Sequence, residues 1–263
     1  MNGGITYNTN SLQTFNRSTR VGINTNVIKH TDIPASVGEL YVVANANNSD
    51  VPDKEDVSRA IQLGGTIHGS SQADLDDRID AFKVIFSKRY KYLDIVYGSS
   101  TRRYTVMKVN AMGVERQDKA LFAKFSVELL SKPYGIDTTA TNILSQTAYT
   151  TATKTITPTI GGSAPYQLPV FTFTLTTITG AGDYIQITNN LTGEETLIYG
   201  LGLVNGDVVV VDSVNHEVRK NGVVVNFSGK FLELETGPAD ITITDGFTTR
   251  SINMNGEYYK RWS

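Results

Sequence analysis

Residues 71–88 read SQADLDDRIDAFKVIFSK, and this is the one stretch of the chain whose apolar residues recur at helical spacing. Its apolar stripe consists of Leu75, Ile79, Phe82 and Phe86. Their spacing places all of them on one side of an α-helix. Ser71 is a natural N-cap, and Asp74 stands where the acidic partner of a capping box belongs. A stripe this narrow predicts one helix that lies on a face of β-structure.

Length and composition set the broad class of the protein. The 263 residues allow two domains of ordinary size, each with its own core. The chain has no cysteine, which excludes disulfides and thiolate metal sites, and only three histidines. The first residues lack the basic and apolar regions of a secretion signal, and no apolar run is long enough to cross a membrane. We therefore expect no leader peptide and no membrane insertion.

The two halves of the chain differ mildly in charge. Residues 1–135 hold 17 Lys/Arg and 14 Asp/Glu, whereas residues 136–263 hold 7 and 12. Neither half carries the clustered basic residues that a surface for duplex nucleic acid requires. Sequence-specific binding of nucleic acid is therefore not expected.

The rest of the first half predicts strands and one long loop. The expected strands are Ser36–Ala44, Ser58–His68, Tyr90–Tyr97, Arg102–Val109 and Ala120–Leu130. Gly98-Ser99-Ser100 predicts a hairpin turn, and a second, longer hairpin ends in the polar residues 115–119. Residues 45–56 are almost wholly polar and predict an exposed loop.

A change in composition marks the domain boundary. Residues 138–159 contain ten threonines and a single charged residue, Lys154. We interpret this segment as an entry strand plus a linker, because threonine is favoured in strands. The predicted domains are residues 1–136 and residues 137–263.

The second domain predicts strand after strand, with turns every eight to twelve residues. The expected strands are Val170–Thr177, Tyr184–Thr188, Thr196–Tyr199, Asp207–Asp212, Glu217–Lys220, Val223–Phe227, Lys230–Leu234, Ile241–Thr244 and Thr248–Met254. Asn221-Gly222 is typical of a type I′ hairpin turn. The predicted fold class is mainly β: a sandwich-like first domain with one α-helix, and a jelly-roll or lectin-like β-sandwich.

No catalytic motif emerges from these residues. The acidic run of Asp74, Asp76, Asp77 and Asp80 suits a solvated helix start better than a metal site. A calcium site built from Asp207, Asp212, Asp183 and Glu194 is conceivable, but turn-bounding acids give the same pattern. Gly200-Leu201-Gly202 lacks the helix that a phosphate loop opens. We expect no cofactor, no metal and no enzyme activity.

The order of the motifs resembles a known family. The first domain carries a glycine-rich strand, LGGTIHG at residues 63–69, then the helix, a hairpin, and a strand that ends in Lys132-Pro133-Tyr134. The second carries Gly206-Asp207, an apolar strand, Asp212, the Asn221-Gly222 turn, and Phe231-x-x-Leu234-x-x-Gly237. In this order the chain resembles the distal tail protein family of siphophages, whose second domain is a galectin-like sandwich.

This resemblance implies a structural protein of the virion. Members of the family form a homo-hexameric ring at the tail tip through their first domains. One side of the ring joins the tail tube protein, and the other carries the baseplate hub or a tail-associated fibre protein. The resemblance further implies that DNA only passes through the lumen, and that the protein is made in the host cytoplasm.

Two exposed segments are candidates for the ring contacts, because a ring subunit needs arms or open strand edges that its neighbours can cover. They are the polar loop at residues 45–56 and the hairpin at residues 109–120. The candidate interface residues are Asn47, Asp50, Asp53, Glu115, Arg116 and Asp118.

Two other functions remain open at this point. The second sandwich could be a carbohydrate-binding module for a host surface sugar, although Trp262 is the only tryptophan and stands at the C-terminal end. The sheet and helix of the first domain would also suit a tail-tube subunit. Open-ended polymers would indicate a tube subunit, and binding of polysaccharide by the second domain would indicate a sugar-binding module.

Overall fold

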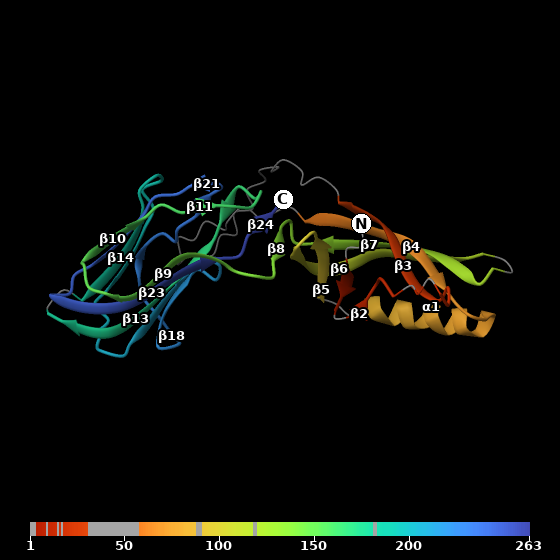
Figure 1. Ribbon diagram of the computed structural model, residues 1–263, viewed down its shortest axis with the longest axis horizontal. Helices are drawn as coiled ribbons and strands as arrows, with labels where there is room; N and C mark the ends of the chain where they lie inside the picture. The colour runs from red at the N-terminus through yellow and green to blue at the C-terminus, as the bar shows by residue number, and fades with distance from the viewer. Residues whose placement is uncertain are drawn as a thin grey trace, which may run out of the picture. The chain divides into compact units, whose positions relative to one another are not determined.

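The computed structural model describes residues 4–8, 10–14, 16, 18–30, 58–87, 91–117, 120–180 and 183–263. The chain divides into two compact units, Met1–Thr138 and Thr139–Trp262. Strands dominate both units, and the described residues contain one helix (Figure 1). The predicted mainly β fold class is confirmed. Within the described residues, no helix has the length and apolar character needed to cross a membrane.

The first unit is built on one curled sheet. Its strands are β1 (Ile5–Tyr7), β2 (Asn10–Ser11), β3 (Gly22–His30), β4 (Arg59–His68), β5 (Lys91–Tyr97), β6 (Ser100–Arg116), β7 (Phe122–Ser131) and β8 (Gly135–Asp137). They pair in the order β2-β1-β5-β6-β7-β4-β3, and β8 also pairs with β6. The predicted turn between β5 and β6 is present, since Tyr97 pairs with Ser100 around Gly98, whose φ is +61°.

The two ends of this sheet are joined by the chain that follows β2. Gln13 and Asn16 form bridges to Asn24 and Val21, which lie in and beside β3. Thr25 donates its hydroxyl to the Leu12 carbonyl at 2.7 Å. The sheet of the first unit therefore closes on itself, whereas the sequence predicted a sandwich-like arrangement.

Helix α1 (Gln72–Phe86) begins and ends as predicted. The Ser71 hydroxyl accepts the Asp74 N–H at 3.2 Å and so caps the first turn. The return bond of the expected capping box is displaced by one residue, because the Asp74 carboxylate accepts the N–H of Ser70 at 2.7 Å. In Figure 1 the helix lies along one face of the sheet, where it contacts β4 and β7.

The predicted apolar stripe forms the contact between helix and sheet. Its members Leu75, Ile79, Phe82 and Phe86 are all buried. Phe82 packs on Phe125 of β7 with ring centroids 4.6 Å apart, and Phe86 stacks on Tyr7 of β1 at 4.7 Å. Burial of each such side chain contributes about 1.5–3 kcal/mol, so the stripe holds the helix in place.

The second unit contains two larger sheets and two short ribbons. Its strands are β9 (Thr141–Tyr149), β10 (Thr153–Ile156), β11 (Thr159–Ile160), β12 (Tyr166–Gln167), β13 (Pro169–Thr179), β14 (Tyr184–Asn189), β15 (Glu195–Tyr199), β16 (Val208–Asp212), β17 (Glu217–Lys220), β18 (Val223–Val225), β19 (Ser228–Gly229), β20 (Leu234–Glu235), β21 (Gly237–Pro238), β22 (Ile241–Asp245), β23 (Thr249–Tyr258) and β24 (Arg261–Trp262). One sheet has the order β18-β17-β16-β13-β23-β9 and the other β10-β22-β14-β15-β19. Strands β11 with β21, and β12 with β20, form the ribbons.

Both larger sheets of the second unit contribute to one core. Phe171, Phe173 and Val211 come from one sheet, and Ile187 and Ile243 come from the other. All are nearly or fully buried. This shared apolar layer is that of a two-sheet sandwich, as the alternation of the sequence predicts.

Two local predictions for the second unit are wrong. Residues 138–159 hold three strands, β9, β10 and the start of a ribbon, where a single strand and a linker were expected. Residues 230–233 are not a strand, because side chains of β15 and the residue before it bind their backbone: the Thr196 hydroxyl donates to the Lys230 carbonyl at 2.6 Å, and Glu194 accepts the Glu233 N–H at 3.1 Å. The expected strand Ser36–Ala44 lies outside the described residues.

Candidate functional site

The long hairpin of β6 and β7 carries the described part of the expected ring contacts. β6 pairs with β5 only as far as Val106, which faces Lys91. From Lys108 to Arg116 its other edge pairs with β7. Among the described strands, none covers the first edge of β6 beyond Val106. An open run of backbone donors and acceptors of this length can pair with another chain.

Two irregularities shape this open edge. The register of β6 against β7 shifts at Met107 and again at Asn110, so each is an extra residue in its strand. Bulges of this kind bend and twist an edge strand. Met112, at this edge, is 39% exposed. The hairpin therefore offers backbone groups together with an apolar side chain.

The far end of the hairpin is tied to the start of the helix. The Arg116 guanidinium donates to Asp76 at 2.7 Å and also to the Gln72 side chain. Gln72 in turn donates to the Ala120 carbonyl at 3.2 Å. Glu115, the neighbouring candidate, faces Lys124 across the hairpin and accepts from Gln117 at 3.2 Å. Both described candidates, Glu115 and Arg116, are thus exposed residues at one end of the hairpin.

The remaining interface candidates cannot be placed. Asn47, Asp50, Asp53 and Asp118 lie outside the described residues.

The face of the hairpin that points away from the core is polar and carries balanced charge. Its charged residues are the cations Lys108 and Lys124 and the anions Glu115 and Glu128. Asn110 donates to Glu128 at 2.5 Å. Small residues lie between these charged ones on β6: Gly113 faces Ser126, and Ala111 faces Glu128.

The acidic residues at the helix start form hydrogen bonds and ion pairs with residues close to them in the sequence. Asp74 accepts from Ser70 and from Arg78, and these hydrogen bonds lower its pKa to about 2. Asp80 pairs with Lys83 at 3.2 Å. Within the described residues, no group of three potential metal ligands comes together.

The acids considered for calcium also have other partners. Asp183 accepts the N–H groups of Gly202 and Leu203, and Asp212 accepts those of Val214 and Asn215. Asp207 accepts the ammonium of Lys220 at 3.0 Å, and the same ammonium donates to the carbonyls of Leu201 and Gly202, each at 3.0 Å. The lysine therefore takes the place that a cation would need among these oxygens.

Hydrogen bonding decides the pKa of Asp207. Burial alone would raise this pKa, but bonds from the Val204 N–H, the Asn221 amide and the Lys220 ammonium together lower it. Asp207 is therefore a charged, buried acceptor at neutral pH.

The three histidines lie in different elements. His30 belongs to β3. His68 stacks on Phe122 with centroids 5.7 Å apart, and burial lowers its pKa. His216 sits in the turn between β16 and β17 with a φ of +52°.

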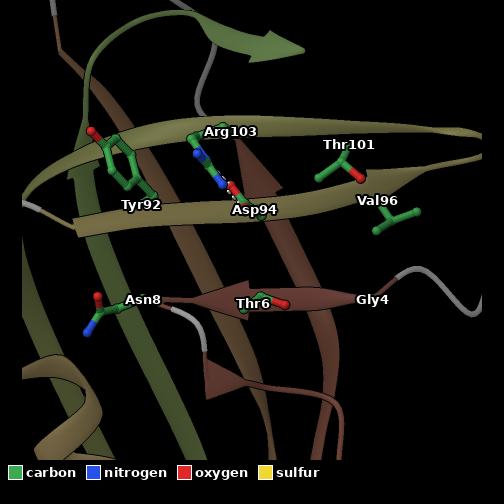
Figure 2. Close-up of a pocket in the computed structure, with 8 residues that line it drawn as sticks. All are labelled: Gly4, Thr6, Asn8, Tyr92, Asp94, Val96, Thr101 and Arg103. Atoms are coloured by element: carbon green, nitrogen blue, oxygen red, sulfur yellow. Dashed lines mark hydrogen bonds and ion pairs between the residues drawn. The ribbon is translucent and has the colours of Figure 1, made fainter. Parts of the chain in front are cut away.

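A shallow depression of about 340 Å³ lies on the face of β1, β5 and β6 that points away from the core (Figure 2). It is lined by Gly4, Thr6, Asn8, Tyr92, Asp94, Val96, Thr101 and Arg103. Thr6 faces Asp94, and Asp94 faces Arg103, so one row of side chains crosses all three strands. The depression exists because β1 contributes only small side chains at Gly4 and Thr6.

An ion pair with two parallel bonds forms the centre of this depression. Arg103 donates through Nε and Nη2 to the two oxygens of Asp94, both at 2.8 Å, and this contact raises the pKa of Arg103. The guanidinium carbon also lies 4.9 Å from the centre of the Tyr92 ring. This site was not predicted from the sequence, because its residues belong to separate strands that only pairing brings together. The one signal in the sequence is that these residues alternate with apolar ones along each strand.

Known proteins resemble this chain in sequence over its second unit and in fold over its whole length. Residues 162–262 match the family model of the siphovirus-type tail component, C-terminal domain. A comparison with curated proteins finds no match.

One solved phage structure shares the fold of the whole chain. The chain is similar to the Dit protein (gp 19.1) of phage SPP1, described as a paradigm of the hub adsorption apparatus in phages that infect Gram-positive bacteria. The TM-score is 0.61 at 11% identity, and the match covers 100% of both chains. A chain of the phage P2 baseplate in its activated conformation matches with a TM-score of 0.41 at 10% identity, over 99% of this chain and 98% of that one.

These comparisons confirm the resemblance to the distal tail proteins and the predicted location in the phage tail. Residues 162–262 of this chain are similar to the C-terminal domain of siphovirus-type tail components.

Proposed function

We propose that this protein is a distal tail protein that forms a hexameric ring at the tail tip. The match of residues 162–262 to a tail-component domain carries the proposal. The whole-chain likeness to the Dit protein of SPP1, which is described as a hub adsorption protein, supports the same position in the virion. The role is structural and not enzymatic, and the second unit is a galectin-like sandwich.

The open edge of β6 is the proposed ring contact of the first unit. A neighbour can pair with the backbone of residues 107–116 and cover Met112 and Val109. A heterologous contact of this kind closes into a ring when its rotation is a whole fraction of a turn. The candidates Glu115 and Arg116 lie at the end of this edge, and Asn47, Asp50, Asp53 and Asp118 remain candidates for the same contact.

The proposed ring has the tail tube protein on one side and the baseplate hub or a fibre protein on the other. DNA passes through its lumen without being bound. The balanced charge of Lys108 and Lys124 against Glu115 and Glu128 suits a lumen wall, because retention of DNA requires uncompensated cations near its phosphates.

The mass of the purified chain in solution tests the ring. We expect light scattering to give six times the 28.7 kDa of one chain, and negative-stain images to show closed six-fold rings. Met112→Lys places a charge on the open edge, and we expect it to shift the protein to monomers. Val84→Lys, on the exposed side of the helix, is the matched control and should leave the rings intact.

Two results would contradict this proposal. Open-ended polymers in the images would indicate a tail-tube subunit. A Met112→Lys protein that still forms rings would exclude the β6 edge as the contact.

A further inference from the structure

We propose that the depression on β1, β5 and β6 binds a neutral saccharide unit. The site lies on the first unit, away from the open edge of β6, and the inference does not depend on the proposed ring. It rests on the hydrogen-bonding groups, the charge and the aromatic ring that this depression brings together (Figure 2).

The Asp94–Arg103 pair supplies donors and acceptors side by side. Each carboxylate oxygen of Asp94 accepts one bond from Arg103 and keeps a further lone pair. The guanidinium uses two of its five N–H donors on Asp94. A sugar hydroxyl donates and accepts at once, so two neighbouring hydroxyls can bridge the carboxylate and the guanidinium.

The charge of the depression favours a neutral ligand. Among the described residues that line it, Asp94 and Arg103 are the charged ones, and they compensate each other at 2.8 Å. A phosphate bound to the guanidinium would stand beside the Asp94 carboxylate and be repelled by it. The hydroxyls of Thr6 and Thr101 extend the uncharged polar lining at either side of the pair.

Tyr92 supplies the apolar contact that sugar rings need. Its side chain is 52% exposed at one end of the depression. The nearby guanidinium fixes the ring, 4.9 Å from its centre, before any ligand arrives. Side chains that are already ordered lose little entropy on binding.

Nuclear magnetic resonance titration of the full chain with neutral sugars tests this inference. The probes are glucose, galactose, rhamnose, N-acetylglucosamine and the disaccharides cellobiose and diacetylchitobiose. We expect saturable shifts at the backbone amides of β1, β5 and β6 with at least one probe, with a dissociation constant in the millimolar range. Inorganic phosphate should neither bind there nor displace the sugar.

Three variants locate the binding. Tyr92→Ala and Arg103→Met should each weaken it at least tenfold, and Asp94→Asn should weaken it as well. Tyr199→Ala, a change at an equally exposed tyrosine of the second unit, should leave it unchanged. Tyr92→Ala leaves both members of the Asp94–Arg103 ion pair in place, so it keeps the test valid if the ion-pair variants unfold.

Several outcomes would overturn the inference. These are no saturable shift with any probe, binding that survives Tyr92→Ala and Arg103→Met, and tighter binding of phosphate than of every sugar. Ring formation is measured separately by light scattering, so failure here leaves the proposed function standing.

Discussion

The end of the β6–β7 hairpin and the loop of residues 200–206 are both exposed, but they are held in different ways. In the loop, Asp183 accepts two backbone N–H groups, and the Lys220 ammonium donates to the carbonyls of Leu201 and Gly202. The hairpin end relies on the ion pair between Arg116 and Asp76, whose side chains are 45% and 51% exposed.

This difference separates a segment with a fixed shape from one that can adapt. Buried charges hold the loop, and breaking a buried charge pair is costly because its partner stays desolvated. Exposed ion pairs contribute little, because water replaces the lost partner. We infer that the loop keeps its shape in every state, whereas the hairpin end can leave the helix when a neighbour binds the open edge of β6.

Among the substitutions that test this contrast, Lys220→Ala should have the largest effect on stability. It leaves Asp207, whose side chain is 7% exposed, without its cation, and two carbonyls without a donor. We expect the free energy of unfolding of the second unit to fall by about 2–3 kcal/mol. Hydrogen exchange of the core amides of each unit is the right measurement, because a chain of two units need not unfold in one step.

The control for this change is Lys230→Ala, at an exposed lysine of the same unit. It should alter the unfolding free energy by less than about 0.5 kcal/mol. A Lys220→Ala protein as stable as this control would show that the ammonium does not hold the loop.

Arg116→Ala should have a smaller effect that is confined to the hairpin end. We expect the free energy of unfolding of the first unit to fall by less than about 1 kcal/mol. Amide exchange of residues 110–117 should nevertheless become faster, because the tie to Asp76 and Gln72 is gone. Hydrogen exchange followed by mass spectrometry resolves this segment.

Lys83→Ala is the matched control, since it removes another exposed ion pair of the same helix, with Asp80. Its hairpin should exchange at the rate of the unchanged protein. If Arg116→Ala also leaves that rate unaltered, the contact with the helix does not restrain the hairpin.

The smallest expected effect is a loss of stability in acid, at the helix start in the first unit and beside the loop in the second. The pKa of Asp74, at the start of the helix, is lowered to about 2, and the pKa of Asp207 is lowered as well. A carboxylate with a lowered pKa in the folded state stabilises the protein above its ordinary pKa of about 3.9, and this contribution is lost as the pH falls below about 4.

Asp74→Asn and Asp207→Asn should therefore flatten the dependence of stability on pH between about 4 and 2 in the first and second unit, respectively. We expect the larger change from Asp74→Asn, because the pH dependence follows the size of the pKa shift and burial offsets part of the lowering at Asp207. Thermal unfolding across this pH range, read by resonances of each unit, is the measurement. Equal changes for the two variants would remove the contrast.

The parts of the fold that depend on local chemistry could be predicted from the sequence. The helix was set by its apolar spacing and the Ser71 cap, and the Asn221-Gly222 turn by two positive φ angles, +53° and +82°. Residues 230–233 were wrongly predicted as a strand. Their alternation is that of a strand, but beyond one bond from Lys230 to Glu195 of β15, the side chains of Thr196 and Glu194 bind their backbone.

Features that depend on strand register could not be predicted. The closure of the first sheet through Gln13 and Asn16 joins segments that no local signal connects. The saccharide site requires Thr6, Asp94 and Arg103 to fall in one row, which only the pairing of β1, β5 and β6 establishes. The role of Lys220 as an internal cation likewise follows from the position of residues 201–202 in space.

The pairing of β9 with β23 has a consequence for synthesis of the protein. The first long strand of the second unit pairs with its last one, Tyr149 with Ile252 and Thr141 with Tyr258. This sheet cannot be completed until residue 258 has left the ribosome, whereas the strands β1 to β8 are available once residue 138 has emerged. We expect the first unit to fold during translation, so that its open edge is ready for neighbours before the second unit has closed.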